Sequence, residues 1–212
     1  MSAVDYAVEG EVAILTVNYP PVNALSYATR IGLGEGLDRA EADPAVKAIV
    51  VMGRGTTFIA GADITEFGTD NGLKEPRLQT LQSRLENSPK LTIAAIHGTA
   101  LGGGLEIALT CAARVAVGSA KLGLPEVNLG LLPGAGGTQR LPRLTGAAIA
   151  LDLITSGKHI SAASALDLGI VDALVDEVHE GAIAFARSAL TGGQVFTPVG
   201  QRQDKVDADA IP

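Results

Sequence analysis

The chain of 212 residues is long enough for one large domain with a full hydrophobic core. Its formal net charge of −7, without a run of Lys or Arg, excludes the electrostatic footprint of a protein that binds nucleic acid or an anionic membrane. A single cysteine excludes a disulfide framework, and no apolar run is long enough to span a bilayer. Since the first residues do not resemble a secretory signal, we predict a cytoplasmic protein, with a peroxisomal location left open.

The first half of the chain alternates between predicted strands and predicted helices. Strands are expected where β-branched and other apolar residues form short runs, and helices where leucines recur at helical spacing. In chain order these segments are a strand at 12–17, a helix at 24–42, a strand at 46–53, a helix at 78–88, a strand at 91–96, a helix at 101–112 and a strand at 114–117. The strands are apolar enough to be covered on both faces, which predicts an α/β fold with parallel pairing.

The chain is predicted to become helical beyond Gly134. The expected helices are at 138–144, 147–156, 161–168 and 180–190, and Ser161 is a suitable N-cap for the third. Residues 191–212 lose the apolar period and are predicted to form a polar tail or the start of a linker. The predicted organisation is therefore one domain over residues 1–190, followed by this tail.

Glycine turns lie where predicted strands give way to helices. Gly102-Gly103-Gly104 has two interpretations: close packing of a strand on a helix, or N–H groups at a helix N-terminus that an acyl oxygen can approach. Such donors are the material of an oxyanion hole. Gly61-Ala62-Asp63 offers a second set of donors, because Asp63 is a good N-cap for the residues after it.

Two glutamates near these turns are candidates for proton transfer. Glu106 lies in the first turns of the glycine-led helix among apolar neighbours, so its carboxyl is expected to be half buried, and Glu126 follows in another apolar loop. Burial raises the pKa of a carboxyl, whereas a helix N-terminus lowers it. Two carboxyls that face one pocket differ in pKa, so one can act as base and the other as acid. The alternative is two solvated surface glutamates.

Motifs for other chemistries are incomplete. The glycine-rich stretch 134–139 departs from a dinucleotide-binding loop at its last position, and neither a P-loop nor a serine nucleophile elbow occurs. The three histidines lack metal-ligand spacing, and one cysteine cannot complete a zinc set. Cys111 lies in an apolar segment and is predicted to be a buried structural thiol. We therefore expect no metal and no redox cofactor.

Four ordered stretches resemble the crotonase (enoyl-CoA hydratase/isomerase) superfamily, at residues 20–26, 58–64, 98–106 and 122–143. More narrowly, they resemble the hydratase portion of the bifunctional enzymes of fatty-acid β-oxidation, which join a hydratase to a 3-hydroxyacyl-CoA dehydrogenase. The resemblance covers about residues 8–190. It implies an α/β fold that is a crotonase-like spiral of β-β-α units with a helical C-terminal part.

The resemblance also implies a role for each matching site residue. The backbone N–H groups of Ala62 and Gly103 would hold the thioester oxygen of an acyl-CoA. Glu106 and Glu126 would share one water: Glu106 would activate it for attack at C3, and Glu126 would deliver a proton to C2. Coenzyme A would enter as part of the substrate, so no separate cofactor is implied. The implied substrate-binding residues are Val22, Ala24, Leu25, Ala60, Asp63, Ile64 and Gly134.

The function implied is reversible hydration of trans-2-enoyl-CoA to 3-hydroxyacyl-CoA in fatty-acid β-oxidation. Two alternatives stay open: Δ3-Δ2-enoyl-CoA isomerisation, which could also be a second activity, and acyl-CoA binding or assembly with little turnover. Family members continue beyond the helix at 180–190 into further helices that complete the acyl pocket and build a trimer interface. This chain is therefore expected to be cut from the hydratase portion, or to be a stand-alone version of it.

The lack of these terminal helices leads to one further expectation. The apolar faces of residues 147–154 and 183–190 would lose their usual cover, and large exposed apolar patches tend to be buried by association. We therefore expect a homo-oligomer, or fusion to a 3-hydroxyacyl-CoA dehydrogenase region.

Overall fold

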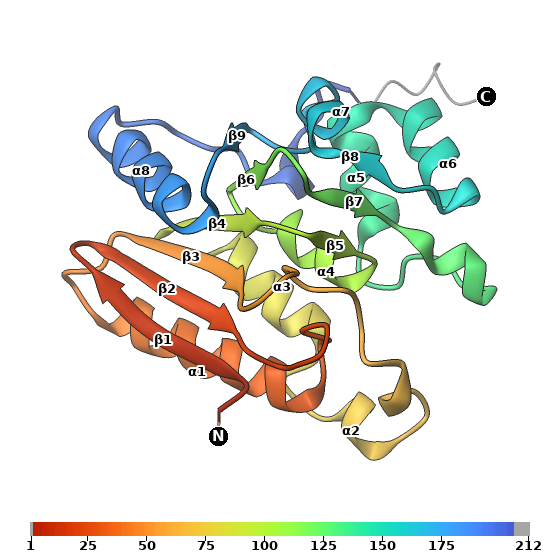
Figure 1. Cartoon of the computed structure of the whole chain (residues 1–212), viewed down its shortest axis with the longest axis horizontal. Helices are drawn as coiled ribbons and strands as arrows, with labels where there is room; N and C mark the ends of the chain where they lie inside the picture. Colours follow the sequence, from red (N-terminus) through yellow and green to blue (C-terminus); the bar gives the residue numbers. More distant parts are fainter. Residues whose placement is uncertain (1, 206–212) are drawn as a thin grey trace.

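A sheet of six strands forms the middle of the molecule, with helices on both of its faces (Figure 1). The computed structural model describes residues 2–205. The strand order is β1-β2-β3-β4-β6-β9, and only the β1–β2 pair is antiparallel. The strands are β1 (Val4–Glu9), β2 (Val12–Val17), β3 (Ala48–Gly53), β4 (Leu91–Ile96), β6 (Ala113–Val117) and β9 (Ala173–Val175).

The central strands are the apolar runs expected from the sequence. β2, β3 and β4 are buried along nearly all of their length, because helices cover both sides of this part of the sheet. The predicted α/β class and parallel pairing are confirmed. β1 is an additional edge strand: its carboxylates at Asp5 and Glu9 keep half of it in solvent and obscure the apolar pattern.

A second sheet contains three very short strands, β5 (Thr99–Leu101), β7 (Lys121–Gly123) and β8 (Ile160–Ser161). β5 pairs in parallel with β7, so that Leu101 lies opposite Gly123. The chain leaves both strands at the same edge, and helix α4 (Gly103–Ala108) begins directly after β5. The helix expected over 101–112 is shorter than predicted at both ends, because Leu101 belongs to β5 and α4 ends at Ala108.

Helices on one face of the large sheet pack on the larger core. They include α1 (Tyr27–Ala42), α3 (Leu78–Glu86) and α4, and their buried leucines and isoleucines contact the sheet residues. α1 begins three residues later than expected, since Leu25 forms a β-bridge with Ala62 and the Ser26 side chain caps the helix. The single cysteine, Cys111, is buried in this core as predicted.

The C-terminal helices are α5 (Gly137–Thr145), α6 (Ala147–Ser156), α7 (Ala162–Asp167) and α8 (Val178–Thr191). Ser161 caps α7 as predicted. The expectation that residues 183–190 lack cover is wrong, because Ile183 and Ala186 pack against the second face of the large sheet (Figure 1). On α6, by contrast, Leu151 is exposed. No helix in the described part of the chain is long and apolar enough to cross a bilayer.

The segment after α8, residues 192–205, runs back toward α5, and we call it the return segment. It contains a short 3₁₀ turn, Val199–Gln201, that packs against α5. Val199 is only 1% exposed and belongs to the larger core. This part of the predicted tail thus contacts the domain, while residues 206–212 of that tail lie outside the described residues.

Candidate active site

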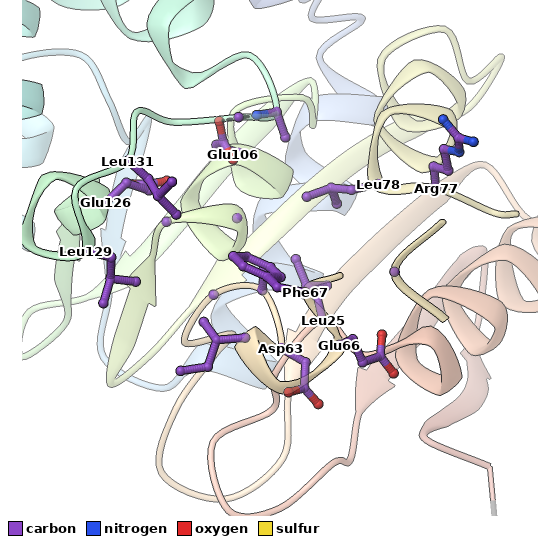
Figure 2. A pocket seen from close by; sticks show the side chains of 18 of the residues that line it. Leu25, Asp63, Glu66, Phe67, Arg77, Leu78, Glu106, Glu126, Leu129 and Leu131 are labelled. Carbon is purple, nitrogen blue, oxygen red and sulfur yellow. Dashed lines mark hydrogen bonds between the residues drawn. The ribbon is translucent and has the colours of Figure 1, made fainter. Parts of the chain in front are cut away.

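A pocket of about 540 Å³ opens where the chain leaves the small sheet. Its walls come from the β5–α4 turn, from the segment between Ala60 and Gln79, and from the loops on either side of Leu129 (Figure 2). Because β5 and β7 are parallel neighbours in register, the residues that follow each strand meet at this edge. The pocket therefore contains both Glu106, after β5, and Glu126, after β7.

The N-terminus of α4 supplies a backbone donor to the pocket. Gly102 has φ +48° and ψ −124°, a conformation that favours glycine, and it turns the chain from β5 into the helix. Gly103 is the first residue of α4, so its N–H has no partner within the helix. A Cβ on Gly103 would lie 3.4 Å from the amide nitrogen of Ala62, which shows how closely the two backbones approach.

Ala62 is held in place by the strand-like segment that precedes α1. It forms a parallel β-bridge with Leu25, whose N–H donates to the carbonyl oxygen of Gly61 at 2.8 Å. Among residues 2–205, the N–H of Ala62 has no recorded hydrogen-bond acceptor. Ala62 and Gly103 therefore line one pocket with their backbones close together.

Glu106 is more deeply buried than the sequence suggests. Its side chain is 2% exposed, and its Oε1 accepts the N–H groups of Ala135 and Gly137, each at 2.8 Å. Burial raises the pKa of this carboxyl, while the two backbone donors and the charge of Arg140 oppose the rise. These donors fix Oε1, so the other oxygen, Oε2, is the one available for chemistry.

Glu126 lies on the 3₁₀ turn Pro125–Leu129, beside the turn into α4. A Cβ on Gly102 would lie 3.3 Å from Glu126 Oε1, close enough that this carboxyl would have to shift by a few tenths of an ångström. Its Oε2 is buried and has no hydrogen-bond partner within residues 2–205. Burial raises the pKa of Glu126, its own backbone N–H lowers it, and the negative charge of Glu106 raises it.

The remaining walls of the pocket are mostly apolar. Leu25, Phe67, Leu78 and Leu131 surround the space next to the two glutamates, and Figure 2 shows them converging on it. Several of these wall residues are exposed at the mouth, including Phe67 at 54%. An apolar pocket with a few convergent polar groups is suited to a small molecule that has an apolar arm and one reactive polar group.

Arg30 fixes the outer wall of the pocket. This side chain of α1 is buried, and it donates to the carbonyl oxygens of Leu25 at 3.2 Å, Asn71 at 2.6 Å and Pro76 at 3.0 Å. It also pairs with Glu66 at 3.3 Å. The wall that carries Phe67 is thereby tied to α1, although it contains only the 3₁₀ turn Ile64–Glu66 and the four-residue helix α2 (Asp70–Leu73).

Most of the site residues predicted from the sequence line this pocket. Besides the two glutamates, Ala62 and Gly103, the lining includes Leu25, Ala60, Asp63, Ile64 and Gly134. Val22 and Ala24 are not among the lining residues; the Val22 side chain is 45% exposed, and its carbonyl accepts the N–H of Ala60. The roles assigned to these residues stay predictions.

The sequence analysis missed three contributors to the site. Ala135 and Gly137 bind Glu106 through backbone N–H groups, which leave no mark on the side-chain pattern. Arg30 could have been noticed, because an arginine on the buried face of a predicted helix needs several acceptors.

Among the described residues, no group of three or more His, Cys, Asp or Glu side chains is arranged to hold a metal.

Comparisons with known proteins show which family this chain belongs to. Residues 7–197 match the family described as enoyl-CoA hydratase/isomerase. The chain is 52% identical over 176 residues to a probable enoyl-CoA hydratase of Bacillus subtilis (strain 168), covering 81% of this chain and 68% of that protein. It is 50% identical over 179 residues to the peroxisomal bifunctional enzyme of Homo sapiens, covering 82% of this chain and 24% of that enzyme. The chain thus spans about a quarter of the length of such bifunctional relatives.

Solved structures lead to the same family. The fold is similar to the crystal structure of an enoyl-CoA hydratase from Bacillus anthracis, with a TM-score of 0.82 and 36% identity, covering 89% of this chain and 77% of that one. It is also similar to the structure of Pseudomonas aeruginosa DspI, with a TM-score of 0.84 and 36% identity over 90% of this chain and 81% of that one. The predicted crotonase-like fold is confirmed.

Proposed function

Since the chain belongs to the enoyl-CoA hydratase/isomerase family, we propose that it catalyses the reversible hydration of a trans-2-enoyl-CoA to the 3-hydroxyacyl-CoA. The observation that carries this proposal is the meeting of two carboxyls, one buried and one half-buried and both with a raised pKa, beside two backbone N–H groups in one apolar pocket. Addition of water to an activated double bond needs a base, an acid and a stabilised oxyanion, and the pocket offers all three.

The backbone donors would act on the thioester carbonyl. When a nucleophile adds at C3, negative charge develops on the thioester oxygen as an enolate forms. The N–H groups of Ala62 and Gly103 would stabilise that charge in a pocket whose walls are mostly apolar. Loss of one such donor lowers the rate of an enzyme by about 10²–10³-fold.

The two glutamates would divide the proton transfers. Ionised Glu106 would remove one proton from a water through Oε2, and the hydroxyl would add to C3 while the π electrons move to the thioester oxygen. Protonated Glu126 would then deliver its proton to C2 as the enolate collapses. The negative charge of Glu106 raises the pKa of Glu126, which supports a protonated Glu126 beside an ionised Glu106. Transfer of the proton held by Glu106 back to Glu126 restores both groups.

An assay of crotonyl-CoA, followed by the absorbance of its enoyl thioester band, tests the proposal directly. The parent chain should hydrate it, and Glu106→Gln and Glu126→Gln should each reduce turnover by at least about 10²-fold. Binding of a saturated acyl-CoA should change far less, because the carboxyls act on the reacting carbons. Near-parental turnover in either variant would contradict the role of that glutamate. A trans-3-enoyl-CoA substrate measures the alternative isomerase activity in the same preparations.

Partners and location are proposals of the same kind. The similarity to bifunctional enzymes supports association with a further catalytic region, for which we propose a 3-hydroxyacyl-CoA dehydrogenase. The similarity to a Bacillus subtilis protein supports a location in the bacterial cytosol. Separating a crude extract by size and assaying each fraction for hydratase and dehydrogenase activity tests the association, since the proposal requires the two activities to migrate together.

A further inference from the structure

An ion pair outside the pocket joins the two helices that flank the loop beneath Glu106. Arg140, in the first turn of α5, donates through Nε to Oε1 of Glu86 at 3.1 Å and through Nη2 to Oε2 at 2.7 Å. Glu86 is the last residue of α3. Both side chains are 14% exposed, so solvent screens this bidentate pair less than a surface pair.

Arg140 also contacts the loop that binds Glu106. Its Nη1 donates to the carbonyl oxygen of Ala135 at 3.4 Å, while the N–H of the same Ala135 donates to Glu106 Oε1. The backbone N–H of Arg140 donates to the carbonyl oxygen of Gly136, which has φ +92°. The loop 135–137 is therefore held by Glu106 on one side and by Arg140 on the other.

The return segment completes this arrangement. The N–H of Gly200 donates to Glu86 Oε1 at 3.0 Å, and a Cβ at position 200 would lie only 2.7 Å from the same oxygen. Val199 next to it is buried in the core beside α5. The carboxylate of Glu86 thus receives donors from α5 and from the segment that follows α8.

The ion pair compensates the position of Arg140 near the start of α5. A cation in the first turn of a helix faces the positive end of the helix dipole, so Arg140 is in an unfavourable place unless an anion compensates it. Glu86 supplies that anion. Burial raises the pKa of Glu86, but the hydrogen bond and the charge of Arg140 lower it, and the net pKa is below its ordinary value. Arg140 in turn acts on Glu106, where its charge opposes the rise in pKa that burial causes.

We propose that Arg140 and Glu86 are positioning residues for the acid–base chemistry: together they hold the loop 135–137 against Glu106, and Gly200 supports Glu86 in this role. The inference rests on the proposed function, because it takes Glu106 to be the base. Charged neighbours influence the pKa values of these carboxyls. Arg140 acts on Glu106, and the charge of Glu106 acts on Glu126. Arg140 and Arg143 both act on Glu86.

The positive charge of Arg140 influences the pH below which hydration is lost. Glu106 must be ionised to act as base, so hydration decreases when the pH falls below its pKa. Removing the positive charge of Arg140 removes one of the influences that lower this pKa. The acidic limb of the profile of kcat/KM against pH should then move to higher pH.

The test uses Arg140→Gln, Arg140→Lys and Glu86→Gln in the full chain, with crotonyl-CoA as substrate. Arg140→Gln should lower kcat by about tenfold, since the loop that fixes Glu106 Oε1 loses a support, and should move the acidic limb upward with a smaller change in KM. Arg140→Lys keeps the charge and should return the limb toward its parental position. Glu86→Gln keeps the shape of the side chain but weakens the ion pair, and it should lower kcat severalfold.

Arg84→Gln is the matched control. Arg84 joins α3 to α1 through Asp38 at 2.7 Å and Glu41 at 3.1 Å, so its loss breaks a similar pair that does not contact the loop 135–137. It should lower the Tm to a similar extent while leaving kcat and the acidic limb unchanged. An active parent with unchanged kcat and acidic limb in Arg140→Gln and Glu86→Gln would overturn this inference alone. A parent that binds acyl-CoA without hydrating it would overturn the proposed function and, with it, this inference.

Discussion

The two sheets of this molecule differ in length, burial and what they carry. The strands of the large sheet are mostly five or six residues long, and the central ones are buried by helices on both faces, whereas the small sheet has strands of two or three residues. Yet both candidate catalytic carboxyls follow strands of the small sheet. The strands of the large sheet thus contribute to both apolar cores, and the small sheet determines where the candidate catalytic groups meet.

This division can be tested most strongly at the two glutamates. Glu106→Gln and Glu126→Gln should each reduce turnover by about 10²–10⁴-fold, because under the proposed function each removes a group that transfers a proton. Neither should lower the free energy of unfolding at neutral pH, because a neutral amide takes the place of a carboxyl that burial makes costly to ionise. Turnover and thermal unfolding of the same samples provide the two readouts. A fall in Tm that parallels the lost activity would indicate a structural role instead.

The oxyanion hole offers the next largest effect. Gly103→Pro removes one backbone donor, and proline is tolerated at the first position of a helix, so turnover should fall by about 10²–10³-fold while α4 stays folded. Gly103→Ala is the control, since it keeps the N–H and adds a Cβ at 3.3 Å from Leu25 and 3.4 Å from Leu78. If alanine and proline reduce turnover equally, crowding rather than the lost donor is responsible.

The same contrast between the sheets explains what the sequence could predict. The large sheet was predictable because runs such as residues 48–53 are apolar throughout and long enough to show a pattern. β5, β7 and β8 are too short for any periodicity, so a helix was expected to begin at Leu101, which belongs to β5. Glu106 and Glu126 were found from their glycine-rich and apolar surroundings and from the family resemblance.

Parts of the site could not be predicted for a different reason. Ala135 and Gly137 act through N–H groups that every non-proline residue possesses, so only their placement in space makes them donors to Glu106. The ion pair of Arg140 with Glu86 joins residues far apart in sequence, which no local pattern reports. The cover that the sheet gives to α8 likewise depends on tertiary packing.

A substitution in the large sheet should have the opposite effect to those at the glutamates. Ile93, in β4, is fully buried between the sheet and α8, so Ile93→Ala should reduce the free energy of unfolding by about 2–5 kcal/mol. Its kcat, measured below the unfolding transition, should stay near the parental value, because the residue does not line the pocket. Denaturant titration and the crotonyl-CoA assay measure the two effects. Loss of kcat in a fully folded sample would show that the two sheets are not separate in function.

The raised pKa values predict a smaller effect on stability. The pKa of the Glu126 carboxyl is raised in the folded chain. Such a group stabilises the folded state at pH values below the pKa that it has in the unfolded chain. This stabilisation is lost as the pH rises through the pKa that it has in the folded chain. The Glu126→Gln variant cannot ionise at this position. Its Tm, relative to the parent, should therefore be higher at about pH 8 than at about pH 4, when both are measured in one buffer series. A difference in Tm that does not change with pH would contradict the burial argument for Glu126.

The smallest effect is expected at a cap that touches neither the pocket nor the large sheet. The side chain of Ser161 accepts the N–H of Ser164 at 3.1 Å and so satisfies one of the free donors at the start of α7. Ser161→Ala removes that acceptor and should cost about 1 kcal/mol of stability without changing kcat or KM. Ser161→Asp restores an acceptor at the same helix end, where a negative charge is also favourable, and should recover the loss. Ser161 also lies on β8, which pairs with β7. A change in kcat in the alanine variant would therefore mean that the outer strand of the small sheet helps to place Glu126. An unchanged kcat would leave that role to β5 and β7.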